Sequence, residues 1–249
     1  WTVADENSAF STKLRLALSA NEDFPDVIAL RADDVAQDLI DSGKFAEVGS
    51  LFDKYASQSW KDAMAEAPSA WYPYMRDGKK YGIPILERAY NADTVLWIRE
   101  DWLKKLNLKA PTTIEELEQV MDAFVNQDPD GNNKKDTYGL AVGFKNSFSS
   151  WGSTVDWVFG AYGTLPAQWN EDADGKLVYG SVQPGAKEAL AKLREWMEKG
   201  YIPKDAGVMD DVKPTESFNA GKTGMVAGPY WLVAWPIGAV KDNVPGAEI

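Results

Sequence analysis

The stretch that decides the fold class is "YNADTVLWIREDWLKKLNLKAPTTIEELEQVMDAFV", residues 90–125. Its first part, 90–97, is typical of an extended segment, and "REDWLKKLNL" predicts a short amphipathic helix. The clearest helix of the chain follows, with a capping-box pattern at Thr113 and Glu116. Apolar side chains then recur at helical spacing, at Ile114, Leu117, Val120, Met121 and Phe124. A strand followed by amphipathic helices predicts an α/β unit.

The same alternation extends toward the N-terminus. Residues 8–20 and 33–43 predict helices, and residues 24–30 between them, "FPDVIAL", predict a short strand. Two further helical stretches run to about Ala67. A turn within 77–85, "DGKKYGIPI", then leads into another predicted strand.

Toward the C-terminus the alternation continues without an internal repeat or a low-complexity linker. Strands are predicted at 137–143 and 177–180, and a long helix at 183–200. The aromatic residues 149–162 predict a further helix. Residues 215–231, "TESFNAGKTGMVAGPYW", predict helix, turn, strand and a turn onto another helix. The fold class is therefore α/β.

Composition excludes several classes of function. The 249 residues contain no cysteine and no histidine, which excludes disulfides, thiol nucleophiles, Ser-His-Asp triads and histidine metal ligands. A formal net charge of −12 argues against nucleic acid and anionic membranes as partners. No apolar run approaches a membrane span, so we expect no direct membrane insertion of this segment. The chain opens on Trp1 without a visible signal peptide, which indicates processing or trimming.

An acidic loop, "DPDGNNKKD" at residues 128–136, follows the clearest helix. Ca²⁺ prefers six to eight oxygen ligands in a flexible geometry. Oxygens at alternate positions of the loop match that need, at Asp128, Asp130, Asn132, the Lys134 carbonyl and Asp136. Gly139 stands where an EF-hand places its bidentate glutamate. Two interpretations remain open: a calcium site short of one or two oxygens, or a solvated turn shaped by Pro129, Gly131 and Asn133.

Three motifs resemble one family. "YGIPILERAYNADTVLWIREDWLKKLNLKAPTTIEELEQVMDAF" resembles the interdomain crossing of the family 1 extracellular solute-binding proteins of bacterial ABC importers, of the maltose-binding-protein-like and Gram-positive oligosaccharide-binding lipoprotein type. "FNAGKTGMVAGPYW" resembles the return crossing, and "SANEDFPDVIAL" the first helix-to-strand junction. The resemblance covers nearly the whole chain. It lacks the opening strand at Trp1 and about the last third of the family after Ile249, so we expect a chain truncated at both ends.

The resemblance implies a periplasmic-binding-protein-like two-lobe fold of type II, incomplete in this chain. Lobe 1 would hold residues 1–88, lobe 2 residues 89–224, and residues 225–249 would form the return crossing toward lobe 1. It also implies an exported bacterial protein, extracellular, membrane-anchored or periplasmic, that works with an ABC permease. Similar acidic loops in some relatives hold a structural Ca²⁺, which favours the calcium interpretation of residues 128–136.

The resemblance also implies a ligand cleft lined by aromatic residues, because sugars stack their C–H faces on Trp and Tyr. Trp231 and Tyr230 follow Gly228-Pro229 on the return crossing and are the leading candidates, with core packing as the alternative. The other candidates are Glu87, Arg88 and Tyr90 on the first crossing, and Trp157, Tyr162 and, less strongly, Trp151 in lobe 2. An ion pair between Glu87 and Arg88 is the alternative there. Trp97, Trp102 and Trp196 sit at periodic apolar positions and are predicted to be core residues.

The predicted function is non-catalytic: capture of an oligosaccharide outside the cell for an ABC permease. A peptide or a modified sugar remains an alternative ligand. The rival class is a glycosidase, which needs only two carboxylates a few ångströms apart. The chain has 38 acidic residues, but no spacing marks such a pair.

Overall fold

The computed structural model describes residues 8–23, 25–30, 33–86, 93–146 and 148–249. The chain divides into two compact units, Trp1–Arg88 and Ala89–Ile249. Each unit is described by itself.

The first unit is mainly helical. Its elements are α1 (Ser8–Ser19), α2 (Asp33–Asp41), α3 (Gly49–Tyr55), α4 (Gln58–Glu66), the 3₁₀ helix η1 (Pro68–Tyr74) and a hairpin of β1 (Met75–Arg76) and β2 (Lys79–Lys80). One small core surrounds Leu14 and a second surrounds Phe52, whose ring meets Trp71 edge-on at 5.2 Å. The predicted helices are confirmed.

The strand predicted at 24–30 is wrong for the described residues. Residues 25–30 have no strand partner, and a strand is stable only when its backbone groups are paired. Ile28 and Leu30 instead pack against the core around Leu14. The turn predicted within 77–85 is a tight hairpin, in which Asp77 and Gly78 both have positive φ, 51° and 73°.

The second unit is built on a three-stranded sheet in the order β3–β7–β4. These strands are β3 (Val95–Ile98), β4 (Tyr138–Ala141) and β7 (Thr223–Gly228). The central strand β7 runs antiparallel to β3 and parallel to β4, and it is buried along its whole length. The amino ends of the parallel strands β4 and β7 therefore lie together, and so do their carboxyl ends.

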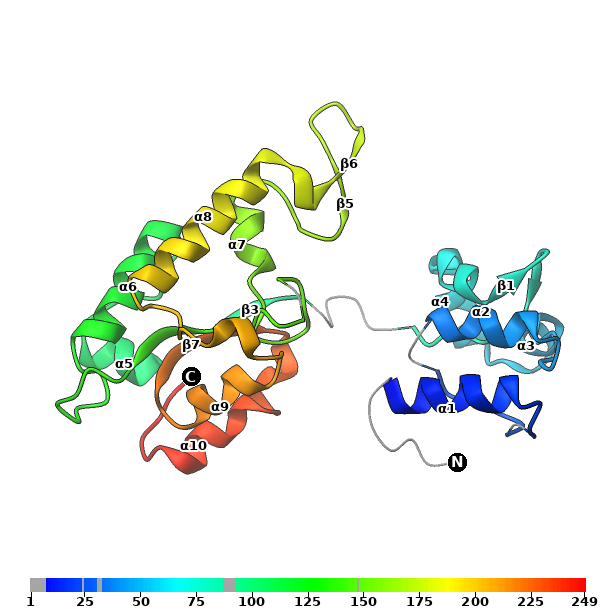
Figure 1. Ribbon diagram of the computed structural model, residues 1–249, viewed down its shortest axis with the longest axis horizontal. Coiled ribbons are helices and arrows are strands. Elements are labelled where there is room, and N and C mark those ends of the chain that lie inside the picture. The colour runs from blue at the N-terminus through cyan, green and yellow to red at the C-terminus, as the bar shows by residue number, and fades with distance from the viewer. Residues whose placement is uncertain (1–7, 24, 31–32, 87–92, 147) are drawn as a thin grey trace. The chain divides into compact units, whose positions relative to one another are not determined.

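The side chains of the sheet alternate between two cores, and helices lie on both faces of the sheet (Figure 1). Leu140 and Met225 face the larger core, with α5 (Glu100–Lys105), α6 (Ile114–Asn126), α7 (Asp156–Ala161) and α8 (Pro184–Glu198). Ala141 and Val226 face the smaller core, with α9 (Lys213–Asn219), η4 (Tyr230–Val233), η5 (Ile237–Ala239) and α10 (Val240–Asn243). A hairpin of β5 (Trp169–Glu171) and β6 (Leu177–Tyr179), η2 (Gly180–Val182) and η3 (Ala206–Val208) complete the unit. Helices on both faces of a sheet confirm the predicted α/β class.

The clearest predicted helix, α6, begins as expected. Thr113 Oγ1 accepts from the Glu116 amide at 3.2 Å, but the Glu116 carboxylate accepts from Thr112, not Thr113, so only half of the capping box forms. Trp102 and Trp196 are buried as predicted, while Leu190 of α8 is exposed. Helix α7 is shorter than the predicted 149–162 because Ser153, at φ 50°, breaks the helical path before it.

Residues 225–249 belong to the second unit, where Leu232 and Ile237 are fully buried. That the segment leads back toward lobe 1 stays a prediction. Within the part of the chain that the structure describes, no helix combines the length and the apolar character needed to cross a membrane.

Candidate functional site

Two candidate sites lie at opposite ends of the same pair of parallel strands. The acidic loop 128–136 enters the amino end of β4, and Lys222 directly precedes β7. The Tyr138 amide donates to the Lys222 carbonyl at 2.8 Å, which holds these two starting points together. The carboxyl ends lead into the segments that carry Trp151 and Trp231. In open α/β sheets, ligands bind outside the carboxyl ends of the strands.

Three tryptophans gather at the carboxyl ends. Trp151 lies 5.4 Å from Trp231 between ring centroids, with 22° between the ring planes. It lies 5.8 Å from Trp235, with 18° between the planes. The Trp235 amide donates to the Trp231 carbonyl at 3.3 Å, so a single helical turn brings both rings to Trp151. We call these three near-parallel indoles the tryptophan stack.

The stack is half core and half surface. Trp151 and Trp231 are partly buried against the smaller core, whereas Trp235 keeps 57% of its surface exposed. An exposed indole ring offers an apolar face on which a ligand ring can stack. The stack therefore offers an apolar platform on a supported base.

Close backbone packing fixes the platform. A Cβ added to Gly228, at the end of β7, would lie 2.9 Å from Leu232 and 3.3 Å from the Trp151 carbonyl. The absence of a side chain at Gly228 thus allows the Trp151 segment to pack closely against β7. On the other side, the Trp97 indole donates to the Pro229 carbonyl at 3.4 Å. Strands β3 and β7 thus hold the turn that carries Trp231.

The other predicted ligand residues differ in their relation to the stack. Tyr230 lies beside it in sequence and is 51% exposed. Trp157 and Tyr162 pack against the larger core, where the Trp157 indole donates to the Thr154 carbonyl at 3.0 Å. Glu87, Arg88 and Tyr90 lie outside the described residues. Sequence reasoning did not select Trp235, although its four-residue spacing from Trp231 is a usable signal.

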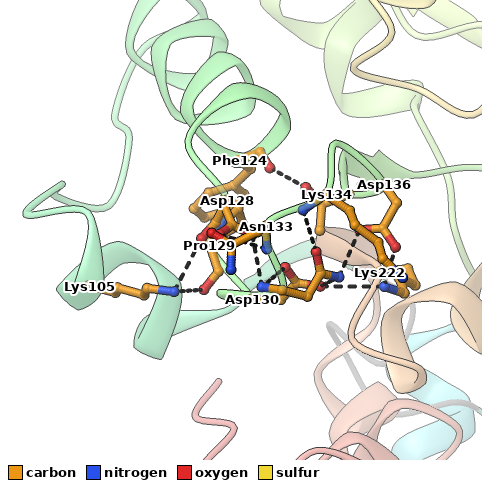
Figure 2. A network of polar contacts seen from close by, with 11 residues as sticks. Lys105, Phe124, Asp128, Pro129, Asp130, Asn133, Lys134, Asp136 and Lys222 are labelled. Carbon is orange, nitrogen blue, oxygen red and sulfur yellow. Dashed lines mark hydrogen bonds and ion pairs between the residues drawn. The ribbon is translucent and has the colours of Figure 1, made fainter.

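The acidic loop at the amino ends is held by its own amides (Figure 2). The Asp128 carboxylate accepts from the Asn132 and Asn133 amides at 3.0 and 3.1 Å. The Asn132 side-chain nitrogen donates to Asp130 at 2.7 Å and to Asp136 at 3.0 Å. Positive φ at Asp128, Gly131 and Asn133 bends the backbone around these contacts.

Two lysines from outside the loop close it. Lys222 Nζ lies 2.7 Å from the Asp136 carboxylate and 3.4 Å from that of Asp130. Lys105 Nζ donates to the backbone carbonyls of Asp128 and Pro129, at 3.1 and 2.9 Å. The hydrogen bond from Lys222 lowers the pKa of Asp136, and the same contact raises the pKa of Lys222.

The loop has the donor chemistry of a hard-cation site. Asp130 and Asp136 both face the lysine ammonium, which occupies the place of a cation between them (Figure 2). The predicted ligand set is not assembled as a metal centre, however. Asn132 turns its nitrogen to the carboxylates, and its oxygen accepts from the Lys134 amide at 2.7 Å. Among the described residues, no three acidic side chains are close enough together to hold a metal ion.

Comparisons with known proteins agree with this architecture. A family model described as bacterial extracellular solute-binding protein matches residues 2–247. In Bacillus subtilis strain 168, the polygalacturonan/rhamnogalacturonan-binding protein YtcQ is 29% identical over 87% of this chain and 41% of its own length, and lipoprotein LipO is 30% identical over 88% of this chain and 42% of its own. The chain thus spans about two-fifths of the length of these curated relatives.

Solved structures give the same result. The S. pneumoniae ABC-transporter substrate-binding protein FusA in complex with kestose is 26% identical, with a TM-score of 0.73 over 95% of this chain and 48% of that chain. An EF-hand mutant of FusA, in complex with fructo-nystose, matches with a TM-score of 0.72 at the same identity and coverage. The chain belongs to the bacterial extracellular solute-binding protein family and has about half of the type II fold of these neighbours.

Proposed function

We propose that this bacterial extracellular solute-binding protein captures an oligosaccharide outside the cell and delivers it to an ABC permease. The tryptophan stack is the platform on which a sugar ring lies. One observation carries the proposal: Trp235, at the carboxyl end of the parallel strands, exposes 57% of its surface while its ring is supported by Trp151. A rigid, exposed indole binds the apolar face of a pyranose or furanose ring at little cost in conformational entropy.

The names of the relatives support a carbohydrate ligand. YtcQ is named for polygalacturonan and rhamnogalacturonan, and FusA is described with kestose and with fructo-nystose. The family is one of solute-binding proteins, which favours binding over the glycosidase alternative.

The proposed ligand contacts are Trp235, Trp231 and Tyr230 at the stack. Glu87, Arg88 and Tyr90 on the first crossing remain proposed partners for sugar hydroxyls. Trp157 and Tyr162 remain secondary proposals, because core packing covers part of each ring. The lobe bounds also remain part of the proposal, with lobe 1 at 1–88, lobe 2 at 89–224 and 225–249 as the return crossing.

An extracellular location follows from the family, and the lipoprotein name of LipO supports membrane anchoring of the whole protein. We include this anchoring in the proposal. It places the captured sugar near a permease without any membrane insertion of the segment described above.

Titration calorimetry with kestose and with oligogalacturonides tests the ligand class. Trp235→Ala should weaken binding more than about tenfold, since a stacking anchor is worth 2 kcal/mol or more. Trp169→Ala is the matched control, because Trp169 in β5 is 69% exposed and lies outside the stack. Equal losses in both variants contradict the assignment. New reducing ends after incubation with these glycans would support the glycosidase instead.

The second part of the proposal assigns a structural Ca²⁺ to the acidic loop. Its ligands would be the carboxylates of Asp128, Asp130 and Asp136, with the Asn132 side-chain oxygen and the Lys134 carbonyl. When bound, the ion would neutralise these carboxylates and tie the end of α6 to the start of β4. The donor chemistry of the loop and the EF-hand wording of the FusA structure support this part.

Thermal melting with Ca²⁺ and with EDTA tests the cation site. A cation that binds only the folded state stabilises it by about 2.7 kcal/mol at a hundredfold excess over Kd. The melting temperature should therefore rise in millimolar Ca²⁺ and fall in EDTA, and Asp130→Ala should abolish the difference. Identical wild-type melting curves in both buffers contradict the assignment.

A further inference from the structure

The acidic loop contains a cation of its own. Lys222 Nζ contacts one carboxylate oxygen of Asp136 at 2.7 Å and one of Asp130 at 3.4 Å. These two carboxylates come from the loop, whereas Lys222 lies between the end of α9 and the start of β7, 86 residues beyond Asp136. Figure 2 shows the ammonium reaching in from outside the loop to the side where Asp130 and Asp136 converge.

The backbone of Lys222 is fixed on both sides. Its amide donates to the Ser217 carbonyl at 2.9 Å, in the last turn of α9. Its carbonyl accepts from the Tyr138 amide at 2.8 Å, which extends the pairing of β4 with β7. The side chain therefore starts from a position that the sheet register sets, and it does not depend on the loop for its placement.

We infer that Lys222 is a tethered counter-cation that holds the acidic loop folded when Ca²⁺ is absent and must be displaced for Ca²⁺ to bind. The inference rests on the calcium part of the proposed function. Lysine and metal compete for the same oxygens of Asp130 and Asp136, and like charges at that distance repel. The loop consequently stays folded without the metal, at the cost of a weaker affinity for Ca²⁺.

Asn132 acts in the same direction. Its side-chain nitrogen donates to both Asp130 and Asp136, so it satisfies the same two carboxylates as Lys222 without adding charge. Cation binding requires Asn132 to present its oxygen to the ion instead. The exchange thus replaces one ammonium group and one neutral amide donor by one divalent ion.

Titration of the 249-residue chain with Ca²⁺ alone, followed by calorimetry, tests the inference. Lys222→Met should tighten Ca²⁺ binding by about fivefold. This factor corresponds to the upper end of the coupling energies of exposed ion pairs. In EDTA the same variant should melt about 2–4 °C below the wild type. Lys222→Arg keeps the charge and should match the wild type in both measurements. Lys176→Met, in the β5–β6 hairpin, controls for the change in net charge and should leave the affinity unchanged.

Each outcome has a defined meaning. Tighter binding by Lys222→Met alone supports the inference, as does a variant that folds only when Ca²⁺ is present. Unchanged or weaker binding by Lys222→Met, with Ca²⁺ bound by the wild type, overturns the inference and leaves the calcium site standing. If neither protein binds Ca²⁺, the inference and the calcium site both fall. If Lys222→Met does not fold, Lys222→Gln takes its place in the titration. It keeps a hydrogen-bond donor without the charge and should also bind Ca²⁺ more tightly than the wild type. Oligosaccharide binding is read in a separate titration and is unaffected by these outcomes.

Discussion

The two ends of the β4–β7 strand pair differ in whether their side chains have partners within the chain. At the amino ends, the Asp130 and Asp136 carboxylates have partners within the chain, from Asn132 and Lys222. At the carboxyl ends, an indole ring of Trp235 is supported from one side and left in water. The carboxylates at the amino end already have partners, whereas the exposed part of the Trp235 ring is available to a ligand. We therefore propose a structural role for the amino end and ligand binding at the carboxyl end.

Strand β7 joins the two ends, so we expect the largest effect from a change in its buried backbone, near its amino end at Gly224. A Cβ at Gly224 would lie 2.1 Å from the Phe124 ring and 3.0 Å from Trp102. Both rings are buried, and overpacking of this kind costs about 1–3 kcal/mol or more. Gly224→Val should therefore lower the denaturant midpoint strongly and disturb both ends together. A Gly224→Val variant with wild-type stability would contradict the prediction that close packing at β7 supports both ends of the strand pair.

The next effect is confined to the carboxyl end. Trp235→Ala should weaken oligosaccharide binding more than about tenfold and leave the Ca²⁺-dependent change in melting temperature intact. The measurement pairs calorimetry with melting curves in Ca²⁺ and EDTA. Loss of both responses in this variant would mean that the two ends are one cooperative site.

The converse change is confined to the amino end. Asp130→Ala should abolish the Ca²⁺ response and change oligosaccharide affinity by less than about twofold, because the buried, fully paired β7 separates the two regions. Affinities measured by calorimetry in EDTA and in Ca²⁺ should likewise agree. A sugar affinity that collapses in EDTA would contradict the structural role of the loop.

The smallest effect comes from a region that touches neither end. On α8, hydrogen bonds from Lys192 and Lys199 lower the pKa of Glu195 to about 2. Because the folded-state pKa is depressed, this contribution to stability is present above the ordinary pKa of 4.5 and is lost as the pH falls toward 2. Glu195→Gln should melt slightly below the wild type at pH 7, and the gap should narrow between pH 5 and pH 3. A difference in melting temperature that widens as the pH falls would contradict this direction of the pH dependence.

Local patterns in the sequence predict much of the fold. The apolar periodicity of α6 and the buried Trp102 and Trp196 follow from helical spacing alone. Segment 24–30 has the composition of a strand, but its described residues 25–30 have no partner strand, which no local pattern reveals. Helix α7 is shorter than predicted for a similar reason, since a single positive φ at Ser153 depends on tertiary packing.

The candidate sites are less predictable because their contacts are distant in sequence. Trp231 was predicted from a motif, but its partner Trp151 is brought to it by the meeting of two strand ends. Lys222 gives no local sign that it will neutralise Asp136, 86 residues away. Only the register of β4 with β7 brings that pair together.

The most direct test of the central claim uses the unmodified protein. N-bromosuccinimide oxidises exposed indoles, and peptide mass spectrometry reads the extent at Trp235 and at Trp169, which are 57% and 69% exposed. Saturating kestose or oligogalacturonide should slow oxidation of Trp235 several-fold and leave Trp169 unchanged, because a bound sugar ring covers the platform. Equal oxidation of Trp235 with and without a sugar that calorimetry shows to bind would contradict the account and move the binding site away from the carboxyl end.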